Sequence, residues 1–412
     1  MPALLRHARF FVAAAVAASG LAVLAPSVAA STTAASSSVQ NGKIVFTRLQ
    51  NSAGEPDIFT VNPDGSALTQ LTTGTTRGMF ASFLGDGTTI AYESVNPSEQ
   101  TLNVSEMNAD GSASHELFQI DQGMALDVAP DGSHFMWLGG NAQQEPVMII
   151  ANADGLDRHE LASPDGVVST AGASFSPDST RIVFVRDSYD FNTTLRAIWT
   201  QDITGTNSQY VVSVPNAYLG SPSLSHDGER VIFGANTIGS STRSFSVANI
   251  DGSDLHSIFS TTLGVDDPIF SPDGTQVAFS AYDNQPGGTQ GPGAGIYVMN
   301  TDGTNVRQLT HGLDVAPSWQ SLPAPPPPNV PPNALGKIYK PYPLWVLADG
   351  TPSTDADGTI VSYFWQWGDY TPFSSGAYAW HHYAAPGTYF VRLTVIDNQG
   401  ATSIRGAWIK VT

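Results

Sequence analysis

Short apolar runs alternate with polar turns through most of the chain, and residues 268–310 show this pattern most clearly. The runs are rich in β-branched and aromatic residues, and the turns between them contain Asp273-Gly274 and Asp302-Gly303. Gly accepts the positive φ that tight turns need, and Asp bonds to its own turn backbone. Since β-branched and aromatic residues favour strands, the pattern predicts an antiparallel meander of four strands.

The same pattern recurs along the chain. The aromatic residue of the second strand returns every 45–49 residues, at Phe46, Tyr92, Trp137, Phe184, Phe233 and Phe279. A repeat of about 40–45 residues with four strands is typical of a β-propeller blade. The alternative is a string of independent meanders, but one meander alone cannot bury both its faces. We therefore expect a propeller.

The two ends of the repeat array predict how the ring closes. The hydrophobic residue of the first strand recurs as Phe83, Val128, Phe175, Leu224, Phe270 and Trp319. The copy that starts at Gly42 has no first strand of its own, and the strand around Trp319 has no further strands after it. We expect this last strand to pair beside residues 43–48, which would close a ring of six blades.

These motifs resemble a known repeat. The S-P-D-G turn at residues 271–274, the run that ends at Phe279 and the N-T-D-G turn at residues 300–303 are similar to the WD40-like repeat of the TolB family. The resemblance covers about residues 41–320 and implies a six-bladed β-propeller. It also implies a role in protein interactions, the main role of TolB-type propellers, although some related propellers are lyases that bind a divalent metal through histidines.

The first 40 residues have a different character. Arg6 and Arg9 precede an apolar run at residues 10–24, and Val28-Ala29-Ala30 offers small residues for cleavage. Residues 1–30 are therefore expected to be a secretory signal peptide. A membrane anchor is the alternative, but the run is shorter than the roughly 20 residues that span a bilayer. Residues 31–40, rich in Ser, Thr and Ala, are expected to be a disordered N-terminal segment.

A second domain is predicted after the propeller, which we place at residues 41–321. Residues 322–333 contain seven prolines in twelve positions, which predicts an extended linker. In residues 334–412, Val361, Tyr363, Trp365 and Trp367 alternate so that they share one strand face, and residues 389–395 alternate in the same way. Two such strands between Gly and Asp turns predict a small β-sandwich.

Residues 355–372 and 381–403 resemble the PKD domain, an Ig-like β-sandwich. Gln366 and Tyr370 depart from the family pattern, which usually has Asp and Gly there. The resemblance implies an accessory module of an extracellular protein that touches polysaccharide or protein. The fold class expected for the chain is thus all-β, with a six-bladed propeller and a C-terminal PKD domain in a monomer.

The amino-acid composition excludes several classes of function and site. The formal net charge is −19, so nucleic-acid binding is not expected, because an acidic chain repels phosphate backbones. The chain has no cysteine, which excludes disulfides and thiolate metal sites. The sequence also lacks the G-x-S-x-G nucleophile elbow and the H-E-x-x-H zinc helix. No cofactor is therefore expected.

Calcium is the one cofactor left open. Asp355 and Asp357 are the best candidate ligand pair, although calcium wants six or more oxygen ligands and Asp-Gly turns usually bond to their own backbone. His381 and His382 are adjacent, so their rings would point to opposite strand faces and make a poor metal pair.

The candidate site is the mouth of the ring. The loops that lead into the first strands carry polar residues that would converge on the ring axis, where ligands commonly bind. The alternative is that they are solvated loop residues. The candidate ligand-binding residues are Arg77, Asp121, Asp266, Asp267, His311 and Asp314.

Two functions remain open. The first is a secreted protein, periplasmic if the host has an outer membrane, whose propeller mouth binds a protein, peptide or glycan while the PKD domain serves as an accessory module. The alternative is an extracellular polysaccharide lyase or glycoside hydrolase that uses the mouth. Binding is favoured because no motif in the sequence carries a catalytic mechanism.

Overall fold

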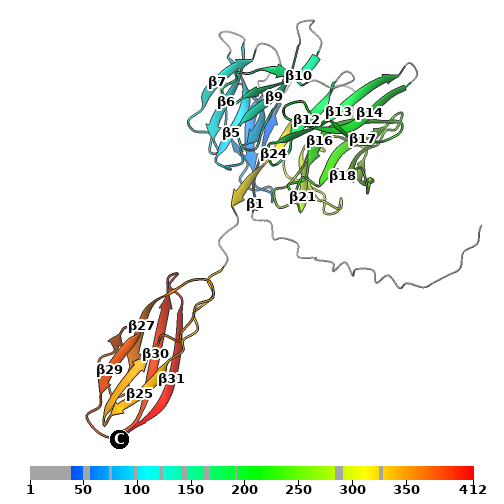
Figure 1. Ribbon diagram of the computed structural model, residues 1–412. Coiled ribbons are helices and arrows are strands. Elements are labelled where there is room, and N and C mark those ends of the chain that lie inside the picture. Colours follow the sequence, from blue (N-terminus) through cyan, green and yellow to red (C-terminus); the bar gives the residue numbers. More distant parts are fainter. Residues whose placement is uncertain are drawn as a thin grey trace, which may run out of the picture.

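The computed structural model describes residues 39–49, 56–73, 77–96, 101–120, 124–140, 146–161, 168–190, 193–283, 291–323 and 328–412. All the regular elements within these ranges are β-strands. The ranges contain no helix that is long and apolar enough to span a membrane. The strands form two β domains, an N-terminal propeller and a C-terminal sandwich (Figure 1).

The N-terminal domain is the predicted six-bladed propeller. Each blade is one antiparallel sheet of four strands. Blade 1 consists of β24 (Asp314–Pro323), β1 (Val39–Arg48), β2 (Asp57–Val61) and β3 (Thr69–Gln70). Blades 2 and 3 consist of β4 (Arg77–Phe83), β5 (Thr89–Asn96), β6 (Thr101–Asn108), β7 (His115–Ile120), and then β8 (Met124–Val128), β9 (His134–Gly140), β10 (Pro146–Asn152), β11 (His159–Glu160).

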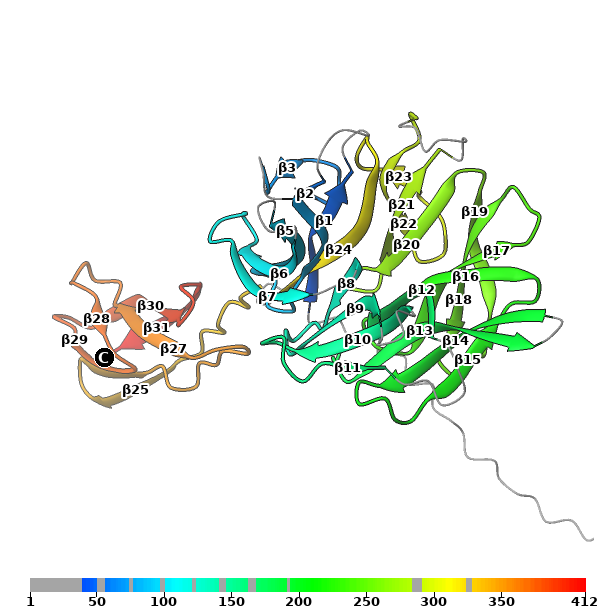
Figure 2. The same ribbon diagram turned by 90° about the horizontal axis from the view of Figure 1, so that it is seen from above.

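The remaining three blades follow the same order of strands. They consist of β12 (Val168–Phe175), β13 (Arg181–Asp190), β14 (Thr193–Asp202), β15 (Gln209–Ser213), then β16 (Ala217–Leu224), β17 (Arg230–Thr237), β18 (Arg243–Asn249), β19 (His256–Thr261), and finally β20 (Gly264–Phe270), β21 (Gln276–Tyr282), β22 (Gly295–Asn300), β23 (Arg307–Gln308). The first strands contact one another around the ring in the order β24, β4, β8, β12, β16, β20 and back to β24. Strands β24, β8, β12 and β20 lie around the centre of the ring in Figure 2.

The ring closes as the repeat array predicts. Strand β24 pairs antiparallel with β1, and Trp319 lies opposite Ile44. At the end of this pairing, Arg48 donates from Nε to Asp314 Oδ1 at 2.6 Å and from Nη2 to Asp314 Oδ2 at 2.8 Å. The Asp314 side chain is fully buried. A two-pronged ion pair thus joins the first and last strands of the propeller.

Hydrophobic packing between neighbouring blades stabilises the ring. The six recurring aromatic residues of the second strands are at most 1% exposed, and they belong to separate clusters that each join two adjacent blades. The cluster that contains Phe46 and Trp319 also includes Ile296 and Val298 of β22, so it joins the last blade to the first. Apolar burial, the main stabilising term in folding, is therefore continuous around the ring.

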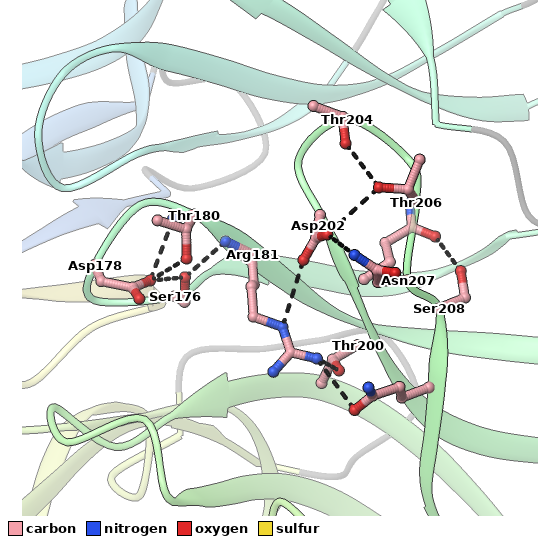
Figure 3. A network of polar contacts seen from close by, with 12 residues as sticks. Ser176, Asp178, Thr180, Arg181, Thr200, Asp202, Thr204, Thr206, Asn207 and Ser208 are labelled. Atoms are coloured by element: carbon pink, nitrogen blue, oxygen red, sulfur yellow. Dashed lines mark hydrogen bonds and ion pairs between the residues drawn. The ribbon is translucent and has the colours of Figure 1, made fainter.

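The recurring Asp turns are held by their own side chains. In blade 4, Asp178 Oδ1 accepts hydrogen bonds from Ser176 Oγ at 2.6 Å and from Thr180 Oγ1 at 2.9 Å (Figure 3). Asp202 of the next turn accepts from Asn207, and its Oδ1 lies 4.0 Å from Arg181 Nε (Figure 3). These carboxylates are engaged in local turn structure, as is usual for Asp side chains in turns.

The C-terminal domain is a sandwich of two sheets. One sheet contains β25 (Lys337–Tyr342), β26 (Trp345–Asp349) and β29 (Tyr378–His382), and the other contains β27 (Ile360–Gln366), β28 (Ser374–Ser375), β30 (Gly387–Asp397) and β31 (Thr402–Val411). Trp365 and Trp367 are buried between them, as predicted. Val361 is 59% exposed instead of facing the core, because the pairing of β27 with β30 shifts between Ile360 and Ser362. Such a bulge reverses the faces of the residues before it.

The end of the proline-rich segment is docked on the sandwich. Asn329 Nδ2 donates to Asp397 Oδ2 at 2.9 Å, and Val330 N donates to Asp357 Oδ2 at 2.9 Å. Asn333 forms an isolated β-bridge with Thr354. Residues 329–333 are therefore held by the second domain, although the sequence predicts an extended linker there.

Candidate functional site

A central channel runs between the first strands of the blades. Its half nearest the loops that lead into these strands has a volume of about 210 Å³, and the opposite half has a volume of about 350 Å³. We call the first half the mouth chamber. Both halves are lined by Ser82, Asp127, Ser174, Ser223 and Ile269, which occupy the same place on five first strands.

A ring of β-bulges shapes the mouth chamber. Every first strand has one residue of positive φ where its pairing with the second strand shifts, and these residues are Phe80, Ala125, Gly172, Ser221, Asp267 and Ala316. A left-handed backbone costs a non-glycine residue on the order of 1 kcal/mol. Five of the six are not glycine, so the wall of the chamber is a strained element that the surrounding blades must hold in place.

Side chains of the preceding blade satisfy the main chain at these bulges. The Phe80 N–H donates to Thr47 Oγ1 at 2.9 Å, and the Ala316 N–H donates to Asp267 Oδ2 at 3.2 Å. Asp127 lies two residues after the bulge residue Ala125 and forms the same kind of bond to the next blade, because its Oδ2 accepts a hydrogen bond from Phe175 N at 2.9 Å. The two carboxylates thus connect neighbouring blades across the channel wall.

Asp267 is the most heavily bonded group of the wall. Its Oδ1 accepts from Ser221 Oγ at 3.2 Å, and its Oδ2 accepts from Ser280 Oγ at 3.3 Å in addition to the Ala316 N–H. The same Ser221 hydroxyl lies 2.6 Å from Asp266 Oδ1. Burial, with a smaller contribution from the neighbouring Asp266 carboxylate, raises the pKa of Asp267 to about 6. Burial likewise raises the pKa of Asp127 to about 6.

The predicted mouth residues have different surroundings. Asp267 lines the chamber, and Asp266 lies beside it. Arg77 is half-buried at the start of β4, and His311 is exposed in the loop before β24. Asp314 is engaged with Arg48 and with Thr310, whose Oγ1 donates to its Oδ2 at 2.5 Å. Asp121 lies outside the described residues, and a binding role for the set stays a prediction.

Asp127 is the channel residue that the sequence analysis did not single out. It directly precedes Val128, one of the recurring first-strand positions, and aligns with Ser82, Ser174, Ser223, Ile269 and Ser318. An acid among mostly serines at one repeat position was the available signal. It is absent from the predicted set because that set contains only residues of the loops expected to lead into the first strands.

Stability of the propeller should increase as the pH falls from 7.5 to about 5. Glu93 is a third acid with a raised pKa, besides Asp127 and Asp267. It is buried, its Oε2 has no hydrogen-bond partner among the described residues, and burial raises its pKa to about 7. A raised pKa means that the folded chain holds protons that the unfolded chain releases, so stability is lost as the pH rises through the folded pKa. The check is thermal melting at constant ionic strength.

A matched pair of variants tests this pH dependence. Asp127→Asn should reduce the change in unfolding free energy between pH 5 and 7 by on the order of 1–3 kcal/mol, since one pKa unit corresponds to about 1.4 kcal/mol. Asp302→Asn should leave the slope unchanged, because Asp302 is an exposed turn residue whose pKa is lowered, first by its hydrogen bond from Thr304. A melting temperature that rises with pH over this range would contradict the expectation.

The PKD-like sandwich contains a second polar cluster where the docked segment meets it. Both carboxylate oxygens of Asp355 and the Oδ1 of Asn329 are buried without a hydrogen-bond partner. A Cβ built on Gly358 would lie 2.7 Å from Asp355 Oδ2 and 2.2 Å from Asn398 Oδ1, so these oxygens face a common space. Burial, followed by the charges of Asp357 and Asp397, raises the pKa of Asp355.

Orphaned buried oxygens of this kind suit a hard cation. The described residues contain no group of three or more His, Cys, Asp or Glu side chains arranged to hold a metal. Calcium would therefore need amide, main-chain and water oxygens beside Asp355. We expect millimolar calcium to raise the melting temperature of the sandwich by several degrees, and Asp355→Asn but not Asp302→Asn to remove the effect. An equal melting temperature with calcium and with chelator would mean that water satisfies these oxygens.

Tyr370, one of the two departures from the PKD pattern, is fully exposed with a φ of 65°. The family usually has Gly at this position, and Gly adopts this conformation without strain. Tyr370→Gly is therefore expected to stabilise the sandwich by about 1 kcal/mol, measured by chemical unfolding. Tyr378→Gly, which alters an exposed strand tyrosine, should be destabilising, and stabilisation by both variants would contradict this explanation.

The histidine pair behaves as predicted. His381 points inward, where its ring stacks on Trp367 with centroids 4.6 Å apart and its Nε2 lies 2.7 Å from Asp369 Oδ2. His382 is exposed and contacts Trp345 with ring centroids 4.7 Å apart. The two rings lie on opposite faces of β29, so they do not form a metal pair.

One sheet of the sandwich presents an aromatic face. Its strands β25, β26 and β29 place Tyr339, Trp345, Tyr378 and Trp380 outward, each between 41% and 61% exposed. Leu347 is paired with both Tyr339 and Trp380, so these residues form one row across the sheet. Exposed aromatic residues are enriched at binding surfaces, which makes this face a second candidate surface.

Comparison with known proteins agrees with both folds. Residues 342–410 match the family described as PKD domain. Collagenase ColA of Clostridium perfringens (strain 13 / Type A) is 46% identical over 63 residues, which is 15% of this chain and 6% of that protein. The chain thus spans a small part of that relative.

The propeller is similar to solved TolB structures. TolB of Acinetobacter baumannii superimposes with a TM-score of 0.55 at 16% identity, over 68% of this chain and 66% of that chain. A putative TolB of Agrobacterium tumefaciens gives a TM-score of 0.50 at 16% identity, over 69% and 99% of the two chains. The protein is therefore a two-domain all-β protein. Its N-terminal domain is a TolB-like six-bladed propeller, and its C-terminal domain belongs to the PKD family.

Proposed function

We propose that this chain is an exported binding protein, that the mouth chamber of its propeller holds part of a protein, peptide or glycan partner, and that the PKD domain is an accessory interaction module. The observation that carries the proposal is the bonding of the two channel carboxylates. Asp127 and Asp267 accept hydrogen bonds from main-chain N–H groups of the neighbouring blade. They are thus fixed parts of a preorganised wall.

This bonding also argues for binding over the alternative, a polysaccharide lyase or glycoside hydrolase. A glycoside hydrolase needs one carboxyl group as proton donor and a second as base or nucleophile. Asp267 already accepts three hydrogen bonds on its two oxygens, which leaves about one of its roughly four lone-pair sites; it can accept one further donor from a bound ligand but is not a free nucleophile. The raised pKa of both acids follows from burial in the wall and does not require a catalytic role.

The aromatic face of the sandwich supports the accessory role. Trp and Tyr provide large contact areas at low entropic cost. A relative matched over 63 residues is named a collagenase, which makes fibrous protein one class of target to include beside glycans. The export step rests on residues 1–30 of the sequence.

Blocking the mouth chamber tests the proposal. Ligands would be selected on the wild-type protein from a glycan array, a peptide library and fibrous collagen. Ser223 lines the channel, and its hydroxyl forms no hydrogen bond with the residues that the structure describes, so Ser223→Trp should fill the chamber without breaking the wall. Leu156→Trp, at a 65% exposed turn position, is the matched control.

We expect at least one selected ligand to lose binding to folded Ser223→Trp and to keep it with Leu156→Trp. Ligands that bind both variants equally would place binding elsewhere and overturn the role of the chamber. Export is checked separately by N-terminal sequencing of protein recovered outside the cytoplasm, with cleavage expected after Ala30. A protein retained inside with residues 1–30 intact would contradict export.

A further inference from the structure

The mouth chamber has an unusual distribution of charge. Among the described residues that line it, Asp127 and Asp267 are the ionisable ones. They come from β8 and β20, which are the third and sixth first strands in the contact order around the ring and therefore lie on opposite sides of the axis. Two carboxylates thus face one small chamber from opposite walls.

The rest of the wall is largely apolar. It includes Phe80, Leu138, Met148, Ile269 and Pro317. An apolar wall with a few fixed polar groups selects a ligand with an apolar body and one complementary charge. At a volume of about 210 Å³, the chamber suits a group the size of one long side chain.

We infer that the mouth chamber takes an alkylammonium or alkylguanidinium group, with its cationic end between Asp127 and Asp267 and its methylene stem against the apolar wall. This inference rests on the proposed function, because it names the ligand chemistry of the same chamber. The group can belong to a lysine or arginine side chain of a peptide partner or to a free aliphatic amine. Both sources share the chemistry, and the experiment separates them.

Electrostatics favours a cation over other ligands. Two half-buried carboxylates between largely apolar walls repel anions and attract a cation more strongly than they would in bulk solvent. Their hydrogen bonds to main-chain N–H groups leave the negative charge in place and use only part of the lone-pair capacity of Asp127. Since the whole chain carries a net charge of −19, long-range attraction also steers cationic partners towards it.

Small probes test the inference directly. Calorimetric titration at pH 7.5 would compare n-pentylamine and n-butylguanidine with n-pentanol and hexanoate. We expect the two cations to bind at least tenfold more tightly than the alcohol, with no binding of the carboxylate and weaker binding at high salt. A peptide with a central lysine, compared with its norleucine analogue, distinguishes a peptide source from a free amine. Equal affinities across cation, alcohol and carboxylate would overturn the inference.

Variants locate the binding. Asp267→Asn should weaken amine binding at least tenfold, whereas Asp302→Asn, at an exposed turn of the same blade, should not. Because Asp267→Asn also alters a structural bond, a second pair keeps the test decisive. Ser174 lines the channel and donates to Pro222 O at 2.9 Å, and both Ser174→Lys and Ser174→Met remove that bond while adding a stem of similar length.

In Ser174→Lys, the introduced lysine side chain should occupy the chamber in place of the inferred ligand. We expect Ser174→Lys to block the amine probes and to melt at a higher temperature than Ser174→Met at pH 7.5. A lower melting temperature for Ser174→Lys, with amine binding retained, would overturn the inference. If the amine probes do not bind but another selected ligand loses binding in Ser223→Trp, the chamber binds a different chemistry and the proposed function stands. Should no ligand depend on Ser223, the proposed function itself fails.

Discussion

Deleting residues 316–320 is expected to abolish the cooperative unfolding of the propeller. The deletion removes the centre of β24, which pairs with β1 and places the buried Trp319 in the cluster between the last and first blades. It also displaces Asp314 from Arg48, and breaking a buried ion pair costs about 3–5 kcal/mol. Together these losses amount to a large part of the free energy of unfolding of a typical domain, which is about 5–15 kcal/mol.

The matched control deletes five residues outside the propeller strands, at positions 324–328 of the proline-rich segment. Calorimetry should show one sharp propeller transition for the wild type and for this control, and a broad or absent transition for the 316–320 deletion. A sharp transition at the wild-type temperature in the 316–320 deletion would show that the ring does not depend on this closure.

Trp365→Ala is expected to unfold the PKD domain. Trp365 is 2% exposed, its Nε1 donates to Gly376 O at 3.1 Å, and its ring stacks on Trp367 with centroids 6.2 Å apart. Replacing a buried Trp by Ala costs about 3–5 kcal/mol, which is much of the stability of a small domain.

The control variant for Trp365→Ala is Trp408→Ala, since Trp408 is 71% exposed on β31. A fragment of residues 328–412, which keeps the docked segment with the sandwich, should give a dispersed β-type NMR spectrum. Trp408→Ala should keep that dispersion and Trp365→Ala should lose it. A folded Trp365→Ala fragment would count against the packing of the two sheets.

The architecture was predictable because its signals are local and repeated. Turn chemistry and strand alternation recur at a fixed interval, and the incomplete first copy shows where Trp319 must pair. The register of β27 was less accessible. The bulge that exposes Val361 depends on pairing with β30, which no property of the residue itself reveals. The docking of Asn329 on Asp397 likewise depends on tertiary structure.

The candidate site was predictable in part for a similar reason. Asp267 was predicted because the repeat pattern assigned it to a loop that leads into a first strand, where polar residues converge on the ring axis; the structure includes it in β20, at the bulge. Asp127 lies within a strand, and its position in the wall follows from the bulge that shifts β8 against β9. Asp314 lies in the predicted loop, but its carboxylate pairs with Arg48 of β1, a contact set by ring closure.

The central claim is that the chamber binds its partner without converting it. The most direct measurement incubates neutral and uronic polysaccharides, and any ligand selected on the protein, with wild-type protein in the presence and absence of calcium or manganese. Mass spectrometry and ultraviolet absorbance then follow conversion over time. We predict that every ligand is recovered intact. Reducing ends or unsaturated product formed in proportion to protein, and lost in Asp267→Asn or His311→Ala, would contradict the claim and establish an enzyme.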